Sequence, residues 1–254
     1  MKSVGEQPAS VAEMGVMGTD GAPANGSART DAGLLGALQL GDSLFPSGGF
    51  TLSHGLETLA ERKLITGADS LHRWLARTVR WQVAPADGVA AAAVWAACDD
   101  LATVAEIDRF LFASKMAREP REASERTGRQ TLASLSTIVG GPLAAYRGEV
   151  LAGRGRGLQP VVVGLAGSHL GLSQRDTVLL LLHLHVSGCL GAALRLIDVD
   201  DIEAQQIRLA LVPVLSAAAD EALALDWRDM YTGAMQTELM AMLHESSTMR
   251  LFAT

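Results

Sequence analysis

Two histidines, His183 and His185, lie in the most apolar stretch of the chain, Thr177 to Leu196. Imidazole nitrogens bind transition metals, and a helix brings two such ligands together when they are four residues apart. Residues two apart point to different faces of a helix, so this pair does not hold a metal by itself. We expect one core histidine and one groove histidine, with a ligand role only if another element supplies a partner.

An acidic cluster, Asp198, Asp200 and Asp201, follows this stretch. A helical enzyme that uses magnesium and a diphosphate substrate needs such carboxylates, with a second acidic cluster on a facing helix. The only other Asp-Asp pair is Asp99-Asp100, and no third acid completes its helical turn. We therefore favour capping of a helix that begins near Asp201, and keep the magnesium-dependent enzyme as the alternative.

Nucleophilic chemistry has little support in the sequence. Ser53 and His54 are adjacent, but the chain lacks a Gly-x-Ser-x-Gly motif, and Ser53 is not on a predicted strand-to-helix turn. We expect His54 to be exposed. Cys98 and Cys189 have no partner at metal-ligand spacing, so we interpret both as buried free thiols.

The densest group of special residues is the segment from Gly41 to Glu57, which we call the elbow. Pro46 fixes its own φ and keeps the preceding residue out of the helical region. Gly48 allows backbone angles that other residues resist. Ser53 or Thr51 is expected to cap the helix that follows. The elbow is thus a shaped turn between two helices, better suited to recognition than to bond-making.

The last eleven residues, which we call the tail, run from His244 to Thr254 and combine charged with apolar side chains. Leu251 and Phe252 are costly to leave in water, and exposed apolar anchors mark binding surfaces. The tail is therefore either a frayed end or a partner-binding segment.

Composition predicts a helical, globular protein. Hydrophobic residues make up 48% of the 254 residues and aromatic residues only 4%, so Leu, Val and Ala build the core and favour helices. The formal net charge of -7 disfavours nucleic acid and anionic membranes as partners. No apolar signal-peptide segment begins the chain, and free thiols suit a reducing compartment, so we expect a cytoplasmic protein.

The hydrophobic pattern divides the chain into an N-terminal segment and one domain. Residues 1–30 are rich in Gly, Ala and Ser without periodicity, and we expect them to be disordered. Helical periodicity over 31–254 predicts an all-α, single-domain bundle of about ten helices. The stretch Thr177 to Leu196 approaches the length of a membrane span, but its polar interruptions, such as Ser187 and Arg195, favour a central buried helix.

Local signals predict several boundaries. Pro85 begins an Ala-rich helix, further helices cover about 104–117 and 121–140, and one long helix runs from about Asp201 to Leu225. Residues 148–157 end in alternating Gly and Arg, without a preceding strand or a following Gly-Lys-Ser/Thr. We interpret this segment as a mobile surface loop and not as a phosphate loop.

Four of these segments resemble the UreF family of urease accessory proteins. The elbow, Asp42-Ser-Leu-Phe-Pro-Ser-Gly-Gly-Phe-Thr-Leu-Ser-His-Gly-Leu-Glu57, is similar to the family's N-terminal signature. The tail, His244-Glu245 with Arg250-Leu-Phe252, is similar to its C-terminal ending. Between them, Arg118 to Gln130 resembles a central Arg-Glu…Ser…Gly-Arg stretch, and Ala192 to Leu196 resembles a Val-Arg-Leu segment. Residues 31–254 thus form a UreF-like all-α domain.

The resemblance implies an accessory protein that is not an enzyme. It implies a scaffold that works with UreD (also called UreH) and with UreG, a GTPase that carries nickel, on apo-urease. The expected outcome is nickel insertion and carbamylation of the active-site lysine. A homodimer in the complex is implied, as is the absence of a permanently bound cofactor. Nickel transits through the complex, and His244 is the candidate for a transient contact.

The resemblance also places partner-binding residues in the elbow and the tail, and implies no catalytic residue. The partner-binding candidates are Asp42, Pro46, Gly48, Phe50, Ser53, Gly55, Glu57, His244, Glu245, Arg250, Leu251 and Phe252. We expect the tail to become ordered on partner binding, with Leu251 and Phe252 filling a groove. Phe50 and Leu52 depart from the family, where tyrosines are common, and Ile197-Asp-Val-Asp200 replaces the usual continuation after the central helix. An interaction module of another complex remains a further alternative.

Overall fold

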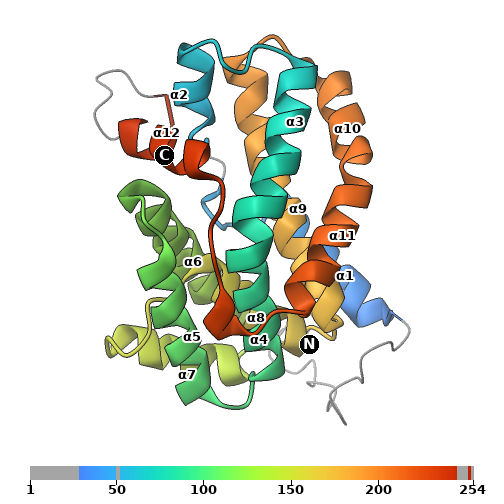
Figure 1. Ribbon diagram of the computed structural model, residues 1–254. Coiled ribbons are helices and arrows are strands. Elements are labelled where there is room, and N and C mark those ends of the chain that lie inside the picture. Colours follow the sequence, from blue (N-terminus) through green and yellow to red (C-terminus); the bar gives the residue numbers. More distant parts are fainter. Residues whose placement is uncertain (1–28, 50–51, 245–250, 253–254) are drawn as a thin grey trace, which may run out of the picture.

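The computed structural model describes residues 29–49, 52–244 and 251–252, and every regular element in these ranges is a helix (Figure 1). The predicted all-α fold is confirmed. The α-helices are α1 (Asp31–Gly41), α2 (Leu56–Glu61), α3 (Ala68–Thr78), α4 (Val89–Ala96), α5 (Leu101–Ser114), α6 (Arg118–Ile138), α7 (Gly141–Leu151), α8 (Gln159–His169), α9 (Gln174–Leu196), α10 (Asp201–Ala210), α11 (Val212–Leu223) and α12 (Met235–His244). A π-helical segment, η3 (Val79–Gly88), joins α3 to α4, and a 3₁₀ turn, η4 (Trp227–Asp229), precedes α12.

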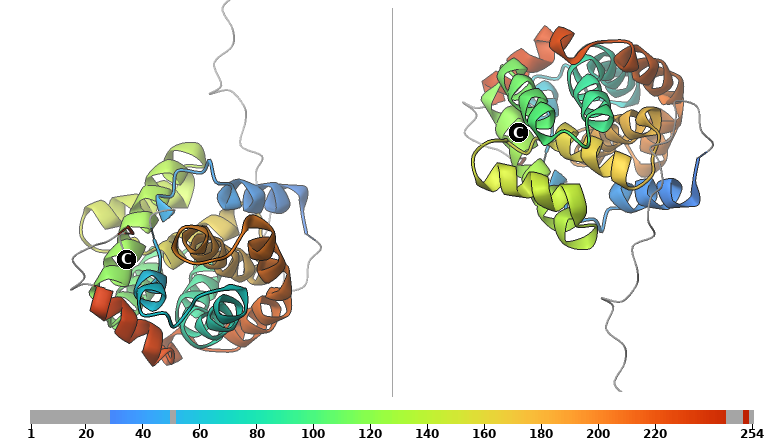
Figure 2. Two further views of the ribbon diagram at one scale, coloured as in Figure 1. Left: turned by 90° about the horizontal axis from the view of Figure 1, so that it is seen from above. Right: turned by 90° about the horizontal axis from the view of Figure 1, so that it is seen from below.

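Helix α9 forms the centre of the bundle. It packs against α1, α2, α3, η3, α4, α8, α10 and α11, and the views along the bundle show other helices around it (Figure 2). Its length and hydropathy would allow it to cross a membrane, but 56% of its most apolar window is buried within the protein. The prediction of a central buried core helix is confirmed.

The N-terminal boundary needs a correction. Residues 1–28 lie outside the described residues, but Arg29 and Thr30, which we assigned to the disordered segment, contact the bundle. The Thr30 hydroxyl caps α1 by accepting from the Gly33 N–H at 3.0 Å. Arg29 forms an ion pair with Asp176 at 2.7 Å. Arg29 and Thr30 therefore belong to the bundle.

The prediction that Pro85 begins a helix is wrong. Pro85 lies inside a continuous helical rod made of α3, η3 and α4. Proline lacks the N–H that an α-helix would donate to the carbonyl four residues back, which here belongs to Trp81. The wider π turns accommodate the proline ring. The Trp81 carbonyl accepts from the Gly233 N–H at 2.6 Å. The Trp81 carbonyl, which the proline leaves without its α-helical donor, thus holds the segment that leads to α12.

The predicted long helix from Asp201 to Leu225 is two helices, because Pro213 follows the break at Leu211 and starts α11. The capping role of the acidic cluster is confirmed at Asp200. Its carboxylate accepts from the Glu203 N–H at 2.8 Å, and the Glu203 carboxylate accepts from the Asp200 N–H at 3.0 Å. This is a capping box, which uses the carboxylates within the chain itself.

The prediction that residues 148–157 form a mobile surface loop needs a correction. Its first four residues end α7, and the remainder is fastened to the buried carboxylate of Asp108 on α5. That carboxylate accepts from the N–H groups of Gly157 at 2.8 Å and Leu158 at 3.2 Å, and also from that of Arg156. The Tyr146 hydroxyl donates to it at 2.6 Å, and burial beside this carboxylate raises the pKa of Tyr146. Asp108 therefore fastens the segment that leads into α8 to the neighbouring helix α5.

Replacing Asp108 by Asn should lower the free energy of unfolding by about 2–3 kcal/mol, since hydrogen bonds to a charged group contribute about 1.5–3 kcal/mol each. Urea titration followed by far-UV circular dichroism measures the change. Glu106→Gln, on an exposed position of the same helix, is the matched control. Equal stability of the two variants would contradict the role of Asp108 in holding residues 156–158.

Candidate functional site

Three of the four resembling segments meet at one buried imidazole, that of His244 at the end of α12. Its Nε2 lies 2.9 Å from a carboxylate oxygen of Glu57, in the elbow. Its Nδ1 lies 2.7 Å from a carboxylate oxygen of Glu119, on α6. All three side chains are buried, with His244 only 1% exposed. We call Glu57, Glu119 and His244 the Glu-His-Glu cluster.

The cluster places both ring nitrogens of one imidazole at hydrogen-bonding distance from carboxylate oxygens. Removing any one member would leave buried polar groups without their partner, which costs several kcal/mol.

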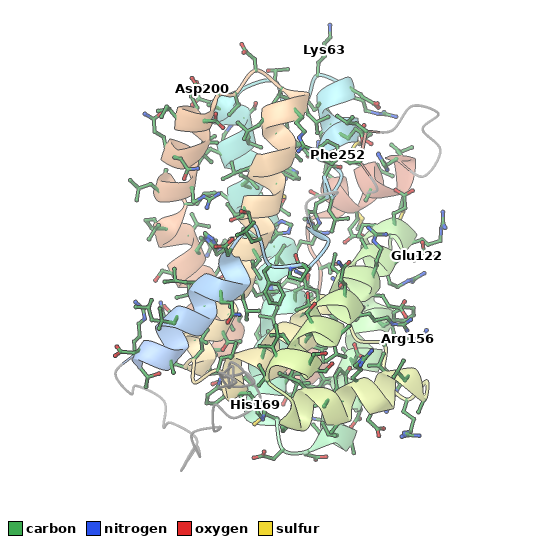
Figure 3. All side chains as sticks on the ribbon, turned by 180° about the vertical axis from the view of Figure 1, so that it is seen from behind. Lys63, Glu122, Arg156, His169, Asp200 and Phe252 are labelled. Carbon is green, nitrogen blue, oxygen red and sulfur yellow. The ribbon has the colours of Figure 1, made fainter. Side chains whose placement is uncertain are left out.

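Glu57 also holds the tail. Its two carboxylate oxygens accept from the Leu251 N–H at 2.6 Å and from the Phe252 N–H at 3.1 Å. The Phe252 side chain is buried, whereas Leu251 is 65% exposed; Phe252 is labelled in Figure 3. The expectation that both residues wait for a partner's groove is wrong for Phe252, which already fills a site within its own chain.

The elbow is divided into an outward and an inward half. Asp42 and Pro46 are exposed, whereas Ser53 and Glu57 are buried. Gly55 is the N-cap of α2 at φ 85° and lies against the backbone of α12. The N-cap residue is Gly55 and not Ser53, so the prediction of a Ser53 cap is wrong; the Ser53 carbonyl accepts from the Leu56 N–H at 3.0 Å.

The residues of the predicted site are thus only partly on a surface. Phe50, Thr51, Glu245 and Arg250 lie outside the described residues. Gly48, at φ 72°, packs so closely on α6 that an added Cβ would lie 2.5 Å from the Gln130 side chain. The inward residues, Ser53, Gly55, Glu57, His244 and Phe252, hold elements together and can influence a partner only through the shape that they maintain.

His244 is not available as a nickel ligand in this arrangement, because both of its ring nitrogens already face carboxylates. A transient nickel contact at His244 would require one of these two contacts to open, and it stays a prediction. Asp200, the centre of the alternative magnesium site, is occupied by its capping box and lies at one end of the bundle (Figure 3).

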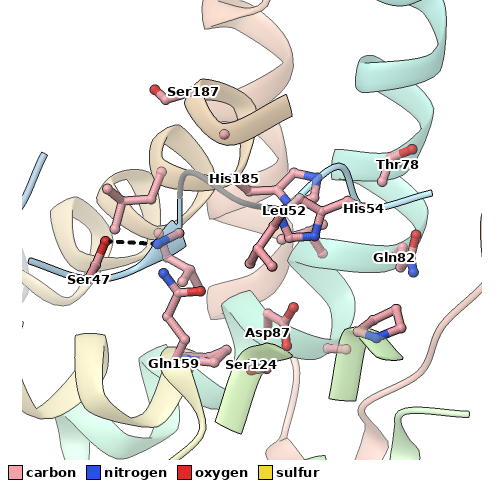
Figure 4. Close-up of a pocket in the computed structure, with 18 of the residues that line it drawn as sticks. Ser47, Leu52, His54, Thr78, Gln82, Asp87, Ser124, Gln159, His185 and Ser187 are labelled. Atoms are coloured by element: carbon pink, nitrogen blue, oxygen red, sulfur yellow. Dashed lines mark hydrogen bonds between the residues drawn. The ribbon is translucent and has the colours of Figure 1, made fainter. Parts of the chain in front are cut away.

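A cavity of about 310 Å³ opens between the elbow, α9, η3 and α12. His54 and His185 line it, and their ring centroids are 4.6 Å apart (Figure 4). The prediction that His54 is an exposed side chain is wrong, because its ring is turned into this cavity. Behind the rings lies Cys189, buried, with its Sγ 3.7 Å from His185 Nε2.

This group of side chains was missed in the sequence, although a signal for two of its three members was there. His185 and Cys189 are four residues apart, which is a metal-ligand spacing on a helix. The claim that Cys189 has no partner at such spacing is therefore wrong. His54 was not predictable as a third member, because only the path of the elbow brings it to α9.

Helix α12 carries an exposed apolar stripe. Met235 is 70% exposed, Leu239 51% and Met242 40%, and these residues recur at helical spacing on one side of the helix. Leu251, held next to the cluster by Glu57, is also exposed. A stripe of this kind on a surface helix is typical of a protein–protein interface.

Comparison with known proteins gives a consistent family. The family model described as UreF matches residues 65–212. A urease accessory protein UreF of Trichodesmium erythraeum is 34% identical over 222 residues, which cover 86% of this chain and 96% of that protein. One from Bacillus sp. (strain TB-90) is 28% identical over 86% of this chain and 98% of its own. A protein named urease accessory protein UreF 2, from Brucella canis, is 31% identical over 89% of this chain and 94% of its own.

Replacing Glu57 by Ala should release the tail. We expect the amides of Leu251 and Phe252 to exchange about tenfold faster or more, because each loses a hydrogen bond to a charged group worth about 1.5–3 kcal/mol. Hydrogen–deuterium exchange mass spectrometry of the C-terminal peptide measures this. Glu61→Ala, on an exposed position of the same helix, should leave the exchange rate unchanged, and equal rates in both variants would contradict the role of Glu57.

Proposed function

Because the chain belongs to the UreF family of urease accessory proteins, we propose that it serves as a scaffold in the assembly of the nickel centre of urease. In this proposal it acts with UreD (or UreH) and the GTPase UreG on apo-urease. Membership of this family makes it an accessory protein and not an enzyme. Nickel is cargo of the complex, and the work takes place in the cytoplasm.

The convergence of separate segments on the Glu-His-Glu cluster is the observation that carries the proposal. Residues 57, 119 and 244 are far apart in the sequence, and each belongs to a segment that resembles the family. The polar groups of the cluster contact one another and thereby join the elbow, α6 and His244 of the tail. Such an arrangement supports a fixed docking surface and leaves these groups unavailable for turnover of a substrate.

The apolar stripe of α12 is the surface that we assign to a partner protein. Met235, Leu239 and Met242 face solvent on a helix whose other side is fastened to the bundle. On that other side, Trp74 Nε1 donates to the Thr237 hydroxyl at 3.3 Å, and Gln82 Nε2 donates to Glu238 at 2.7 Å. The stripe is therefore presented in a fixed orientation, which lowers the entropy cost of binding. UreD is the partner that we assign to it.

The outward half of the elbow offers a second surface, and a homodimer within the complex brings two copies of each. Asp42 and Pro46 are exposed there, beside Leu44, which is 88% exposed. The alternative of a magnesium-dependent diphosphate enzyme has lost its support, since Asp200 is used for capping. An interaction module of a different complex is distinguished from the present proposal by the experiment below.

Replacing Leu239 by Arg should abolish co-purification with UreD. A charged side chain in the middle of the apolar stripe remains without a partner when the interface closes, and this costs several kcal/mol of binding free energy. The measurement is a pull-down of UreD, UreG and apo-urease by the full chain. Residue 239 is exposed, so the melting temperature should stay near that of the wild type.

Gln236→Arg adds the same charge at an exposed position of the same helix, outside the stripe, and should leave co-purification intact. Loss of binding in both variants would indicate a charge effect without a specific surface. Retention of UreD by Leu239→Arg would move the interface away from α12. If the wild type binds none of the three proteins, the proposed function itself fails.

A further inference from the structure

The side chains of His54, His185 and Cys189 converge at the wall of the cavity. Their nearest ligand atoms all lie within 4.8 Å of one another. His185 and Cys189 are one turn apart on α9, with Nε2 and Sγ 3.7 Å apart. His54 comes from the elbow, and its ring lies beside that of His185 at an angle of 56° (Figure 4). Two elements that are distant in sequence thus bring two imidazoles and one thiol to a single point.

An unusual backbone conformation at His54 brings its ring to this point. His54 has φ 54°, in the left-handed region that non-glycine residues seldom adopt. The neighbouring Gly55 is also left-handed, at φ 85°, and starts α2. These two angles turn the chain so that the imidazole enters the cavity next to Gly188 of α9. Strain of this kind is characteristic of functional sites.

We propose that His54, His185 and Cys189 form a binding site for a late first-row divalent metal ion, with Ni²⁺ as its cargo. Imidazole and thiolate ligands suit nickel and zinc, whereas magnesium and calcium require oxygen ligands. Bonds of about 2.0–2.3 Å place the donors of one tetrahedral ion some 3.3–3.8 Å apart. The observed spacing requires the side chains to close by about 1 Å, which rotation of the His54 ring can supply.

Three protein ligands leave the fourth position open toward the cavity. Structural zinc sites have four protein ligands, whereas sites that exchange a ligand keep one position for water or an incoming group. Both imidazoles line the cavity, and Cys189 closes the site from behind. An ion held in this way is accessible from one side only, as transfer of a cargo ion requires.

The protonation states agree with this assignment. Burial lowers the pKa of His54 to about 3 and that of His185 to about 4, and the Lys115 ammonium contributes to both shifts. The two imidazoles are therefore neutral ligands at pH 7. Burial raises the pKa of the Cys189 thiol, so the thiol keeps its proton until a metal displaces it. Lys115 does not leave an excess positive charge near the site, because it pairs with Asp87 at 2.6 Å.

Metal binding through Cys189 should release one proton, because a metal displaces the proton of the thiol that it binds.

The experiment uses the full chain, reduced, with NiCl₂ or ZnCl₂ alone as the probe. Isothermal titration calorimetry should show one strong site per chain, and Ni²⁺ should give a sulfur-to-nickel charge-transfer band. In buffers of different ionisation enthalpy, the wild type should release about one proton per ion, as expected for one thiol. Cys189→Ser should lose the band and the proton release, and bind at least tenfold more weakly.

Two matched controls and one further ligand variant keep the inference falsifiable. Cys98→Ser removes the other cysteine, which lies beside Ser168, and His183→Ala removes a histidine on another face of α9; both should bind as the wild type does. His54→Ala tests the elbow ligand and should weaken binding without loss of the band. Circular dichroism verifies that each variant is folded.

Wild-type binding that Cys189→Ser leaves unchanged, or no binding at all, would overturn this site. The choice of nickel as cargo rests on the proposed function, but the two fail separately. If UreD and UreG co-purify with a chain that binds no metal, the site is wrong and the accessory role stands. If the metal binds through Cys189 but no partner co-purifies, the site stands and the accessory role is wrong.

Discussion

The hydrogen bonds of the Glu57 carboxylate are the interaction on which the arrangement of α2, α12 and the pair Leu251–Phe252 depends. It accepts from the His244 ring and from two backbone amides of the tail. In this way it joins α2, α12 and the pair Leu251–Phe252, and through His244 it reaches Glu119 on α6. A carboxylate that is only 4% exposed is tolerable only when its oxygens are hydrogen-bonded. The positions of α2, of His244 and of Leu251–Phe252 are therefore fixed together.

The rod formed by α3, η3 and α4 explains how α12 comes to this place. The proline in η3 leaves the Trp81 carbonyl free to accept from the Gly233 N–H. Thr237 and Glu238, four and five positions later, contact the same rod through Trp74 and Gln82. Glu238 also accepts weakly from the Ala117 N–H at the start of α6. Because Thr237, Glu238 and the elbow also line the cavity, the exposed stripe of α12 and the cavity wall belong to one mechanically continuous unit.

The sequence was sufficient to predict features that depend on local periodicity. It was less informative about contacts between segments that are distant in the chain. The all-α fold, the core helix α9 and the cap at Asp200 follow from local patterns. The rod through Pro85 did not, because the N–H donor that replaces the missing proline N–H at the Trp81 carbonyl comes from residue 233. The fastening of residues 156–158 by Asp108 was equally invisible, since it joins segments that are about 50 positions apart.

The histidines show most clearly why residue type alone could not assign roles. His244, with a carboxylate at each nitrogen, is used as a structural link. His54 and His185 face no carboxylate at hydrogen-bonding distance among the described residues, and burial keeps them neutral. A neutral imidazole beside a thiol has a lone pair to offer, whereas an imidazole between two carboxylates has none. The acids that surround each ring therefore decide whether it holds the fold together or is free to hold an ion.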